Sequence, residues 1–177
     1  MHVRRVVTRN DTDGSAIVDT DEAVDGVTVQ LLPGYEWHRL WGTDDVIEVP
    51  DGGQPSAELS SFPTTEGFRF GLLTIGPDSV AISDDIDVAD ALEELNRKLP
   101  GMGDNQETDD PSMHTTDTVD CLYVVSGRVV LDLDGGRTVE LGPGDTLVQN
   151  GTRHAWRNPF DEPCQIVLTN LGASRTR

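Results

Sequence analysis

The sequence predicts an all-β protein of the sandwich or barrel class, because its C-terminal third alternates turn signals with short apolar segments. The turns contain Gly, which supplies positive φ, and Pro, which fixes φ; examples are Ser126-Gly127 and Gly142-Pro143-Gly144. They recur about every eight residues. The segments between them have strand length and are rich in β-branched, Leu and aromatic residues. These segments are Thr118–Val125, Arg128–Leu133, Arg137–Leu141, Thr146–Gln149, His154–Asn158 and Cys164–Thr169.

The N-terminal part shows looser strand patterns. A chain of 177 residues suits one domain. Residues 1–110 are therefore expected to complete a barrel whose core is residues 111–173. The Asp-rich stretch Thr20–Gly26 is expected to be a loop. The expected N-terminal strands are Val3–Thr8, Ser15–Val18, Thr28–Leu32, Tyr35–Trp41 and Phe68–Ile75.

One helix is predicted, over Asp87–Leu99. Val88, Leu92 and Leu95 recur at helical spacing and acidic residues crowd the first turn. Pro100-Gly101 follows and would end the helix.

Side-chain alternation places candidate functional groups on shared faces of strands. Asp120 shares a face with Leu122, and His154 shares one with Trp156. If both faces point inward, a carboxylate and an imidazole meet in an apolar cavity, where an indole offers a flat wall for a planar substrate. Alternation also places Tyr35, Trp37, Arg39 and Trp41 on one face, which either packs at a barrel end or subunit interface or lines the substrate pocket. His38 is expected to be an ordinary sheet histidine.

The C-terminal segment resembles the cupin superfamily, and in particular its small single-domain cupin-2 proteins. In the first cupin motif, counting back from Gly127 puts Asp120 at the Glu ligand, Thr116 at the second His and His114 at the first His. In the second motif, Gly151, His154 and Asn158 match, while Gln149 replaces the usual Pro. The resemblance implies a double-stranded β-helix, or jelly-roll, barrel with N-terminal strands and one short helix.

The same resemblance implies a metal site formed by His114, Asp120 and His154. Two imidazoles and one carboxylate suit a divalent first-row metal ion such as Fe, Mn, Ni or Zn. The alternative is a pocket in which the same groups hydrogen-bond a ligand without metal. Trp156, Thr116 and Gln149 are the expected substrate-pocket residues.

Two functions remain open on this basis. The first is a metal-dependent enzyme of dioxygenase, isomerase, cyclase or decarboxylase type that acts on a small planar organic substrate inside the barrel. The second is a non-catalytic barrel that binds a small molecule. A homodimer is expected in either case, because the aromatic face of Tyr35–Trp41 could pack across a subunit interface.

The composition of the chain argues against two classes of binding partner. The chain has 32 acidic and 13 basic residues, a net charge of -19, which repels nucleic acid and anionic membrane surfaces. The basic N-terminus is not followed by an apolar stretch, so a cytoplasmic location is expected. Cys121 and Cys164 lack metal-site spacing and are expected to be reduced, buried thiols. The predominance of Asp over Glu and of Arg over Lys favours a halophilic protein.

Stability is expected to rise with salt. A charge of -19 on a small surface opposes compaction, and screening weakens this repulsion because the Debye length falls to about 3 Å at molar ionic strength. We expect a higher thermal unfolding midpoint in molar KCl than in dilute buffer. An equal or lower midpoint in molar KCl would contradict the halophilic interpretation.

Overall fold

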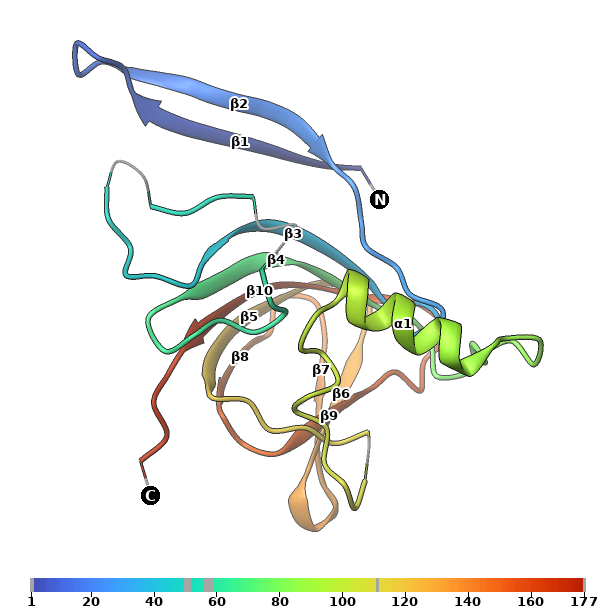
Figure 1. Cartoon of the computed structure of the whole chain (residues 1–177). Coiled ribbons are helices and arrows are strands. Elements are labelled where there is room, and N and C mark those ends of the chain that lie inside the picture. Colours follow the sequence, from blue (N-terminus) through green and yellow to red (C-terminus); the bar gives the residue numbers. More distant parts are fainter. Residues whose placement is uncertain (1, 50–51, 56–58, 111, 177) are drawn as a thin grey trace.

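The computed structural model describes residues 2–49, 52–55, 59–110 and 112–176. It confirms the prediction of a mostly β protein with one α-helix (Figure 1). Pro111, the first residue of the predicted barrel core, lies outside the described residues. The elements are β1 (Val3–Asn10), β2 (Ala16–Val24), β3 (Glu36–Thr43), β4 (Phe68–Ile75), α1 (Val88–Lys98), β5 (Thr118–Ser126), β6 (Val129–Leu133), β7 (Arg137–Leu141), β8 (Thr146–Asn150), β9 (His154–Arg157) and β10 (Cys164–Gly172).

The strands form three antiparallel sheets. A five-stranded sheet has the order β3-β4-β10-β5-β8, and a three-stranded sheet has the order β7-β6-β9. The third sheet is the hairpin β1-β2, which stands apart at the N-terminal end (Figure 1). The N-terminal strands β3 and β4 thus share a sheet with strands from the C-terminal segment. None of the helices described is long and apolar enough to cross a membrane.

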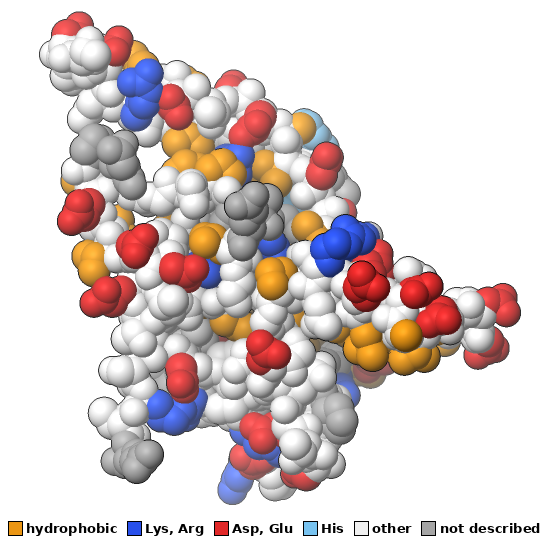
Figure 2. Space-filling view, in the orientation of Figure 1, with side chains coloured by type: hydrophobic (Ala, Val, Ile, Leu, Met, Phe, Trp, Pro, Cys, Tyr) orange, Lys and Arg blue, Asp and Glu red, His pale blue; other side chains and the backbone are white. Residues whose placement is uncertain are grey.

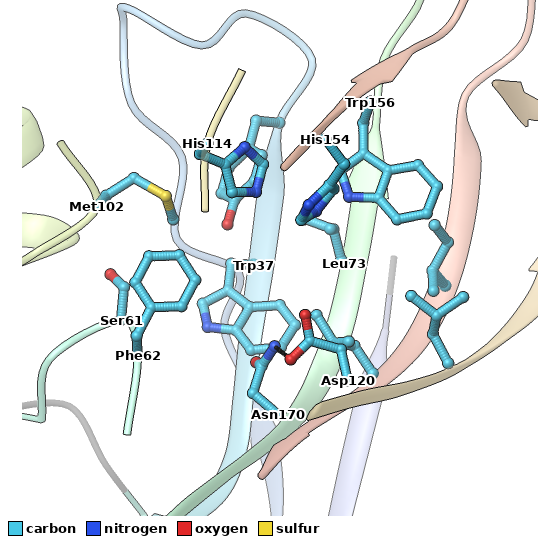
Figure 3. Close-up of a pocket in the computed structure, with 14 residues that line it drawn as sticks. Trp37, Ser61, Phe62, Leu73, Met102, His114, Asp120, His154, Trp156 and Asn170 are labelled. Atoms are coloured by element: carbon cyan, nitrogen blue, oxygen red, sulfur yellow. Dashed lines mark hydrogen bonds between the residues drawn. The ribbon is translucent and has the colours of Figure 1, made fainter. Parts of the chain in front are cut away.

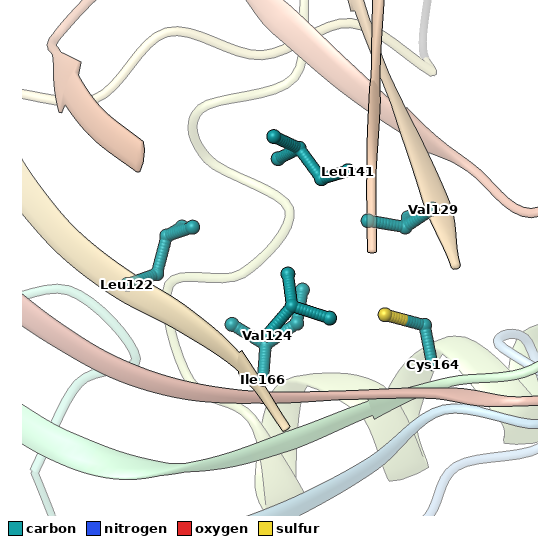
Figure 4. Packing of buried hydrophobic residues seen from close by; sticks show 6 residues of the cluster. All are labelled: Leu122, Val124, Val129, Leu141, Cys164 and Ile166. Carbon is teal, nitrogen blue, oxygen red and sulfur yellow. The ribbon is translucent and has the colours of Figure 1, made fainter. Parts of the chain in front are cut away.

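The main core lies between the five-stranded and three-stranded sheets (Figure 4). Leu122, Val124 and Ile166 come from the larger sheet, and Val129 and Leu141 come from the smaller one. All five side chains are buried because alternate residues of each strand face the opposite sheet.

Two N-terminal predictions are wrong. The segment Thr28–Leu32 forms turns and not a strand, and the amide of Leu32 donates to the carbonyl of Val29. Thr20–Gly26 is not a loop, because β2 extends to Val24. Cross-strand ion pairs hold the acidic residues of β2 against the arginines of β1 and so offset the low strand propensity of Asp. The pairs are Arg4–Asp21, Arg5–Glu22 and Arg9–Asp19.

The segment Tyr35–Trp41, most of which lies in β3, does not keep its four long side chains on one face. Its pairing with β4 shifts register between Arg39 and Trp41, as in a β-bulge. Trp37 is buried in an apolar cluster on the inner side, whereas Trp41 faces outward and lies 5.8 Å from the guanidinium of Arg5. The bulge therefore separates aromatic residues that simple alternation places together.

Helix α1 buries a different face from the one that the sequence indicated. Asp87 caps its start by accepting hydrogen bonds from the amides of Ala89 and Asp90. Ala91 and Leu95 are buried, while Val88 and Leu92 are exposed.

A row of buried polar side chains crosses the inner face of the five-stranded sheet. Arg69 of β4 pairs with Asn170 of β10, Asn170 pairs with Asp120 of β5, and Asp120 pairs with Gln149 of β8. None of the four is more than 6 % exposed. Buried polar groups must be hydrogen-bonded or they cost free energy, so each member of the row needs a partner.

Arg69 ties two loops to the end of this row. Its guanidinium donates to the carbonyls of Ser60 at 2.8 Å and Thr43 at 2.8 Å and to the carboxylate of Asp44 at 2.7 Å. It also contacts the carbonyl of Phe62 at 3.4 Å. The loop that carries Ser61 and Phe62 is thereby fixed against the sheet.

Replacing Arg69 by Leu should destabilise the fold strongly. The substitution leaves the Asp44 carboxylate and the carbonyls of Thr43 and Ser60, in part-buried hydrogen bonds, without their donor. The expected loss in free energy of unfolding is about 3–5 kcal/mol, measured by urea denaturation. Arg4→Leu is the control, because it breaks an exposed ion pair with Asp21 and should cost less than about 1 kcal/mol. Equal losses in the two variants would contradict this role of Arg69.

Candidate active site

A cavity of about 700 Å³, including the part open to solvent, lies inside the fold against the polar row. Its walls are mainly apolar and aromatic, and Figure 3 shows the side chains that line it. It adjoins an outer depression that shares Tyr35, Phe62, Met102 and Trp156 and extends to Arg157. The lining residues are Tyr35, Trp37, Ser61, Phe62, Leu73, Met102, His114, Asp120, Leu122, His154, Trp156, Ile166, Leu168 and Asn170.

His114 and His154 meet in this cavity because their backbones pair. The amide of His114 donates to the carbonyl of His154 at 2.9 Å, and the reciprocal bond is 3.0 Å long. Their ring centroids lie 4.1 Å apart at an interplanar angle of 53°. Trp156 meets the His154 ring edge-on, with a centroid distance of 6.0 Å. An isolated bridge between a loop and β9 therefore places two imidazoles side by side.

The tautomer of His154 follows from its hydrogen bond. Its Nδ1 lies 2.9 Å from the carbonyl oxygen of Thr152, which can only accept, so Nδ1 carries a proton. In the neutral ring Nε2 then holds the lone pair. The carbonyl of Thr152 also accepts from Nε2 of Gln149 at 3.1 Å. Gln149, the last member of the polar row, thus holds the group that orients His154.

Asp120 is held by the next member of the row. The side-chain amide of Asn170 donates to Asp120 Oδ1 at 2.7 Å. In Figure 3 the two imidazoles lie in the upper part of the cavity and the Asp120–Asn170 pair lies in the lower part, beside Trp37. The cavity therefore has two sets of polar groups among its aromatic and apolar walls.

Burial changes the acid–base properties of all three groups. Burial, together with a smaller effect of the neighbouring His154, lowers the pKa of His114 to about 4. Burial also lowers the pKa of His154, although the bond to Thr152 and the charge of Asp120 act in the opposite direction. For Asp120 burial raises the pKa, against the bonds from Asn170 and Thr118. Two imidazoles with lowered pKa and one carboxyl with raised pKa thus line one cavity.

The predicted metal ligands His114, Asp120 and His154 all line this cavity. Within the described part of the chain, however, no three His, Cys, Asp or Glu side chains form a group that could hold a metal ion. One oxygen of Asp120 is already engaged with Asn170. These residues as arranged do not fit a three-ligand metal site.

Of the predicted pocket residues, Trp156 lines the cavity, but Thr116 and Gln149 do not. Thr116 is bonded to Thr118 through their hydroxyls at 2.7 Å. The sequence analysis did not single out Phe62, Met102 or Asn170 as pocket residues. The polar Asn170 inside an apolar strand is the signal that could have identified one of them.

Of the two roles open to the aromatic residues of Tyr35–Trp41, lining the pocket applies to Tyr35 and Trp37, because both line the cavity. Trp41 lies outside the cavity, and the expected homodimer stays a prediction. His38 is buried on the other side of the sheet, with its Nε2 3.7 Å from Glu36, and does not line this cavity.

The fold and the cavity define a mostly β protein in which two facing sheets surround an inner cavity. Residues 104–170 match the Cupin_2 family model, described as the cupin domain. This match covers part of the chain and agrees with the resemblance that the two motifs indicated.

Short stretches of the chain also match curated fungal proteins. Oryzines biosynthesis cluster protein J of Aspergillus oryzae is 44% identical over 50 residues, which are 28% of each chain. Phomopsin biosynthesis cluster protein D of Diaporthe leptostromiformis is 46% identical over 46 residues, which are 26% of this chain and 24% of that protein. The chain thus spans about a quarter of the length of the curated relatives it matches.

Among solved structures, the polyketide cyclase RemF from Streptomyces resistomycificus is 18% identical, with a TM-score of 0.46. The match covers 87% of this chain and 78% of that one. A putative ethanolamine utilization protein from Salmonella typhimurium is 10% identical with a TM-score of 0.44, covering 98% and 99% of the two chains.

The buried imidazole of His114 should make stability depend on pH. An unfolded His titrates near 6.5 and the folded one near 4, so between these values the unfolded state binds the proton and the folded state does not. The free energy of unfolding therefore decreases by up to roughly 3 kcal/mol as pH falls from 6.5 to 4. Asp120 acts in the opposite direction, since its raised pKa lets the folded state bind the proton first.

Comparison with His114→Asn isolates the His114 contribution. Urea denaturation at pH 7 and pH 4.5 should show a smaller loss of stability in the variant than in the wild-type protein. Identical pH dependence in both proteins would show that the His114 ring is not buried in its neutral form.

Proposed function

We propose that this protein is an enzyme that binds a small planar, largely apolar molecule in the cavity and moves a proton on a carbon next to a carbonyl group. The observation that carries this proposal is the neutral, oriented imidazole of His154 in the same aromatic cavity as the buried carboxyl of Asp120. The finer fold assignment, a jelly-roll barrel, belongs to the same proposal, and the two facing sheets with a shared core support it.

Binding is attributed to the aromatic walls. Trp37 and Trp156 lie on different strands and both line the cavity. Stacked or edge-on aromatic contacts favour a flat ligand. The enclosing side chains Phe62, Leu73 and Met102 exclude water from the same space, which strengthens electrostatic interactions inside it.

The chemical step uses one base and one acid. His154 Nε2 takes a proton from the carbon, while the carboxyl of Asp120 gives a proton to the carbonyl oxygen, so that a neutral ketone becomes a neutral enol. The new imidazolium and carboxylate then attract each other. In an isomerisation the imidazolium then returns its proton to a different carbon, and the enol O–H gives its proton back to Asp120. In a cyclisation the enol carbon attacks a second carbonyl of the substrate, the imidazolium protonates the new alkoxide oxygen, and the enol O–H gives its proton back to Asp120. Neither reaction needs an oxidant.

Asn170 and Thr152 are positioning residues in this scheme. Asn170 fixes one oxygen of Asp120, and Thr152 fixes the ring orientation of His154. His114, in ring contact with His154, keeps water from one side of the base.

The metal-dependent function remains a second candidate. The observation in its favour is the pair of neutral imidazoles in ring contact, since a divalent first-row metal binds the deprotonated nitrogen. His114 and His154 would supply two ligands of the ion, which would act as a Lewis acid, whereas Asp120 does not form a ligand group with them in this arrangement.

Deuterium exchange into 2-tetralone, a planar ketone with acidic C–H bonds, tests the proposal. In D₂O we expect exchange above the buffer rate with the wild-type protein, measured by NMR. His154→Gln should lower the protein-dependent rate by about 10²–10⁴-fold, the usual contribution of a general base. EDTA should leave the rate unchanged. Trp41→Leu is the control, because Trp41 lies outside the cavity.

The other outcomes identify the alternatives. Binding of 2-tetralone without exchange would support the non-catalytic barrel. Loss of exchange with EDTA, together with one metal ion per chain that His154→Ala removes, would support the metal-dependent enzyme.

Binding itself is tested by quenching of tryptophan fluorescence with 2-naphthol. Trp156→Leu should weaken binding of 2-naphthol by about tenfold, because it removes an aromatic contact worth about 0.5–1.5 kcal/mol beyond its area. Trp41→Leu should leave the affinity unchanged. Equal effects of the two substitutions would place the ligand elsewhere.

A further inference from the structure

The inner cavity opens outward into a larger depression. The depression has a volume of about 1650 Å³, including the part open to solvent, compared with about 700 Å³ for the inner cavity. A shared set of side chains lines both, so the two form one continuous space. This set is Tyr35, Phe62, Leu73, Met102, His114 and Trp156. A molecule held against His154 in the inner cavity can therefore extend into the depression.

The fold leaves apolar side chains of this depression in water. Val80 is 46% exposed and Ile82 is 45% exposed, and both lie in the loop between β4 and α1. The loop continues with Asp84 and Asp85, so it is not apolar throughout. Figure 2 shows hydrophobic side chains gathered beside α1 among acidic ones. Exposed apolar groups that adjoin a cavity mark a surface that a ligand or partner covers.

Arg157 gives the depression a positive charge. Its Nη2 donates to the hydroxyl of Ser112 at 2.6 Å, and its Nε lies 3.6 Å from Asp132. A guanidinium has five N–H donors, and the side chain remains 38% exposed, so donors are left for a ligand. Asp78 also lines the depression, but its Oδ1 accepts from the backbone amide of Asn158 at 3.0 Å. The same wall thus combines apolar side chains with an available cationic donor.

We propose that the substrate is a planar carbonyl compound with an apolar chain that ends in a carboxylate, and that Arg157 recognises this carboxylate. The inference rests on the proposed function for the planar part, which occupies the inner cavity. The apolar chain lies in the depression against Val80 and Ile82. Its carboxylate accepts hydrogen bonds from the guanidinium of Arg157, and such charge-assisted bonds are stronger than neutral ones. Arg157 is therefore a specificity-determining residue.

The charges around Arg157 favour an anion with a single charge. Asp132 lies beside the guanidinium, and Asp78 lines the same depression. A doubly charged phosphate is repelled more strongly than a carboxylate by these two side chains and by the net charge of -19. The two oxygens of a carboxylate also match the planar fork of a guanidinium.

The test measures quenching of tryptophan fluorescence by matched probes. Each probe is a 2-naphthyloxy group on a butanoic, hexanoic or octanoic chain, used as the acid and as the neutral primary amide. This range of lengths suits the roughly 10 Å that three residues of β9 place between His154 and Arg157. In the wild-type protein we expect at least one acid to bind about tenfold more tightly than its amide, as for a hydrogen bond to a charged group.

Two arginine variants separate recognition from net charge. Arg157→Gln should bind the acid and the amide equally, because the cationic donor is gone. Arg153→Gln removes the same charge from an arginine outside the depression, which pairs with Asp134, and should keep the preference for the acid. Both variants should bind 2-naphthol as the wild-type protein does, since 2-naphthol has no chain.

Ile82→Ser tests the place of the apolar chain. It should weaken binding of the preferred acid about threefold, because it removes apolar surface that the chain covers. Val139→Ser is the control, since Val139 is 43% exposed on β7 and lies outside the depression.

Three results would each overturn this inference: no preference for any acid in the wild-type protein, an unchanged preference in Arg157→Gln, or equal affinity of Ile82→Ser and Val139→Ser for the acid. A failure of the proposed function looks different. It would appear as absence of deuterium exchange into 2-tetralone, a ketone with no chain to reach the depression.

Discussion

The buried polar row across the five-stranded sheet is the constraint on which the site depends. Arg69, Asn170, Asp120 and Gln149 come from four strands, yet strand register places them side by side on the inner face. A slip of one residue would turn a whole strand's side chains to the opposite face. Each member is satisfied locally, so the row itself favours the correct register: an unpaired Asp or Arg in this position would cost several kcal/mol.

The acid–base character of the cavity follows from the same constraint. Because the row is buried, the charged form of Asp120 is disfavoured and its pKa rises, while Asn170 keeps the carboxyl in place. Gln149 donates to the carbonyl of Thr152, which in turn accepts from His154 and fixes the orientation of its ring. The sheet thus supplies both the low-polarity environment and the hydrogen bonds that fix the reactive groups. An apolar residue at Asn170 would release the Asp120 carboxyl, and one at Gln149 would remove a hydrogen bond from the Thr152 carbonyl.

The sequence predicted what depends on local pattern. Turn spacing located the strands of the C-terminal segment, and alternation placed Asp120 and Trp156 in one cavity, as the structure has them. The sequence pattern did not predict features that depend on contacts between residues far apart in the chain. The bulge in β3 separates Trp37 from Trp41, and cross-strand ion pairs extend β2 through an acidic stretch. The pairing of His114 with His154 depends on a single backbone bridge, and periodicity does not report such bridges.

Strand β5 links the two faces of the sheet. Asp120 and Leu122 face the cavity and the core, while Cys121 and Tyr123 face outward, so the same few peptide units carry the buried carboxyl and an exposed surface. Strand β10 pairs with this strand and carries Asn170, which holds the Asp120 carboxyl. A change on the outer face that shifts either strand would therefore also move this carboxyl. Since proton transfer depends steeply on the placement of acid and base, the outer face of β5 constrains the chemistry that is proposed for the cavity.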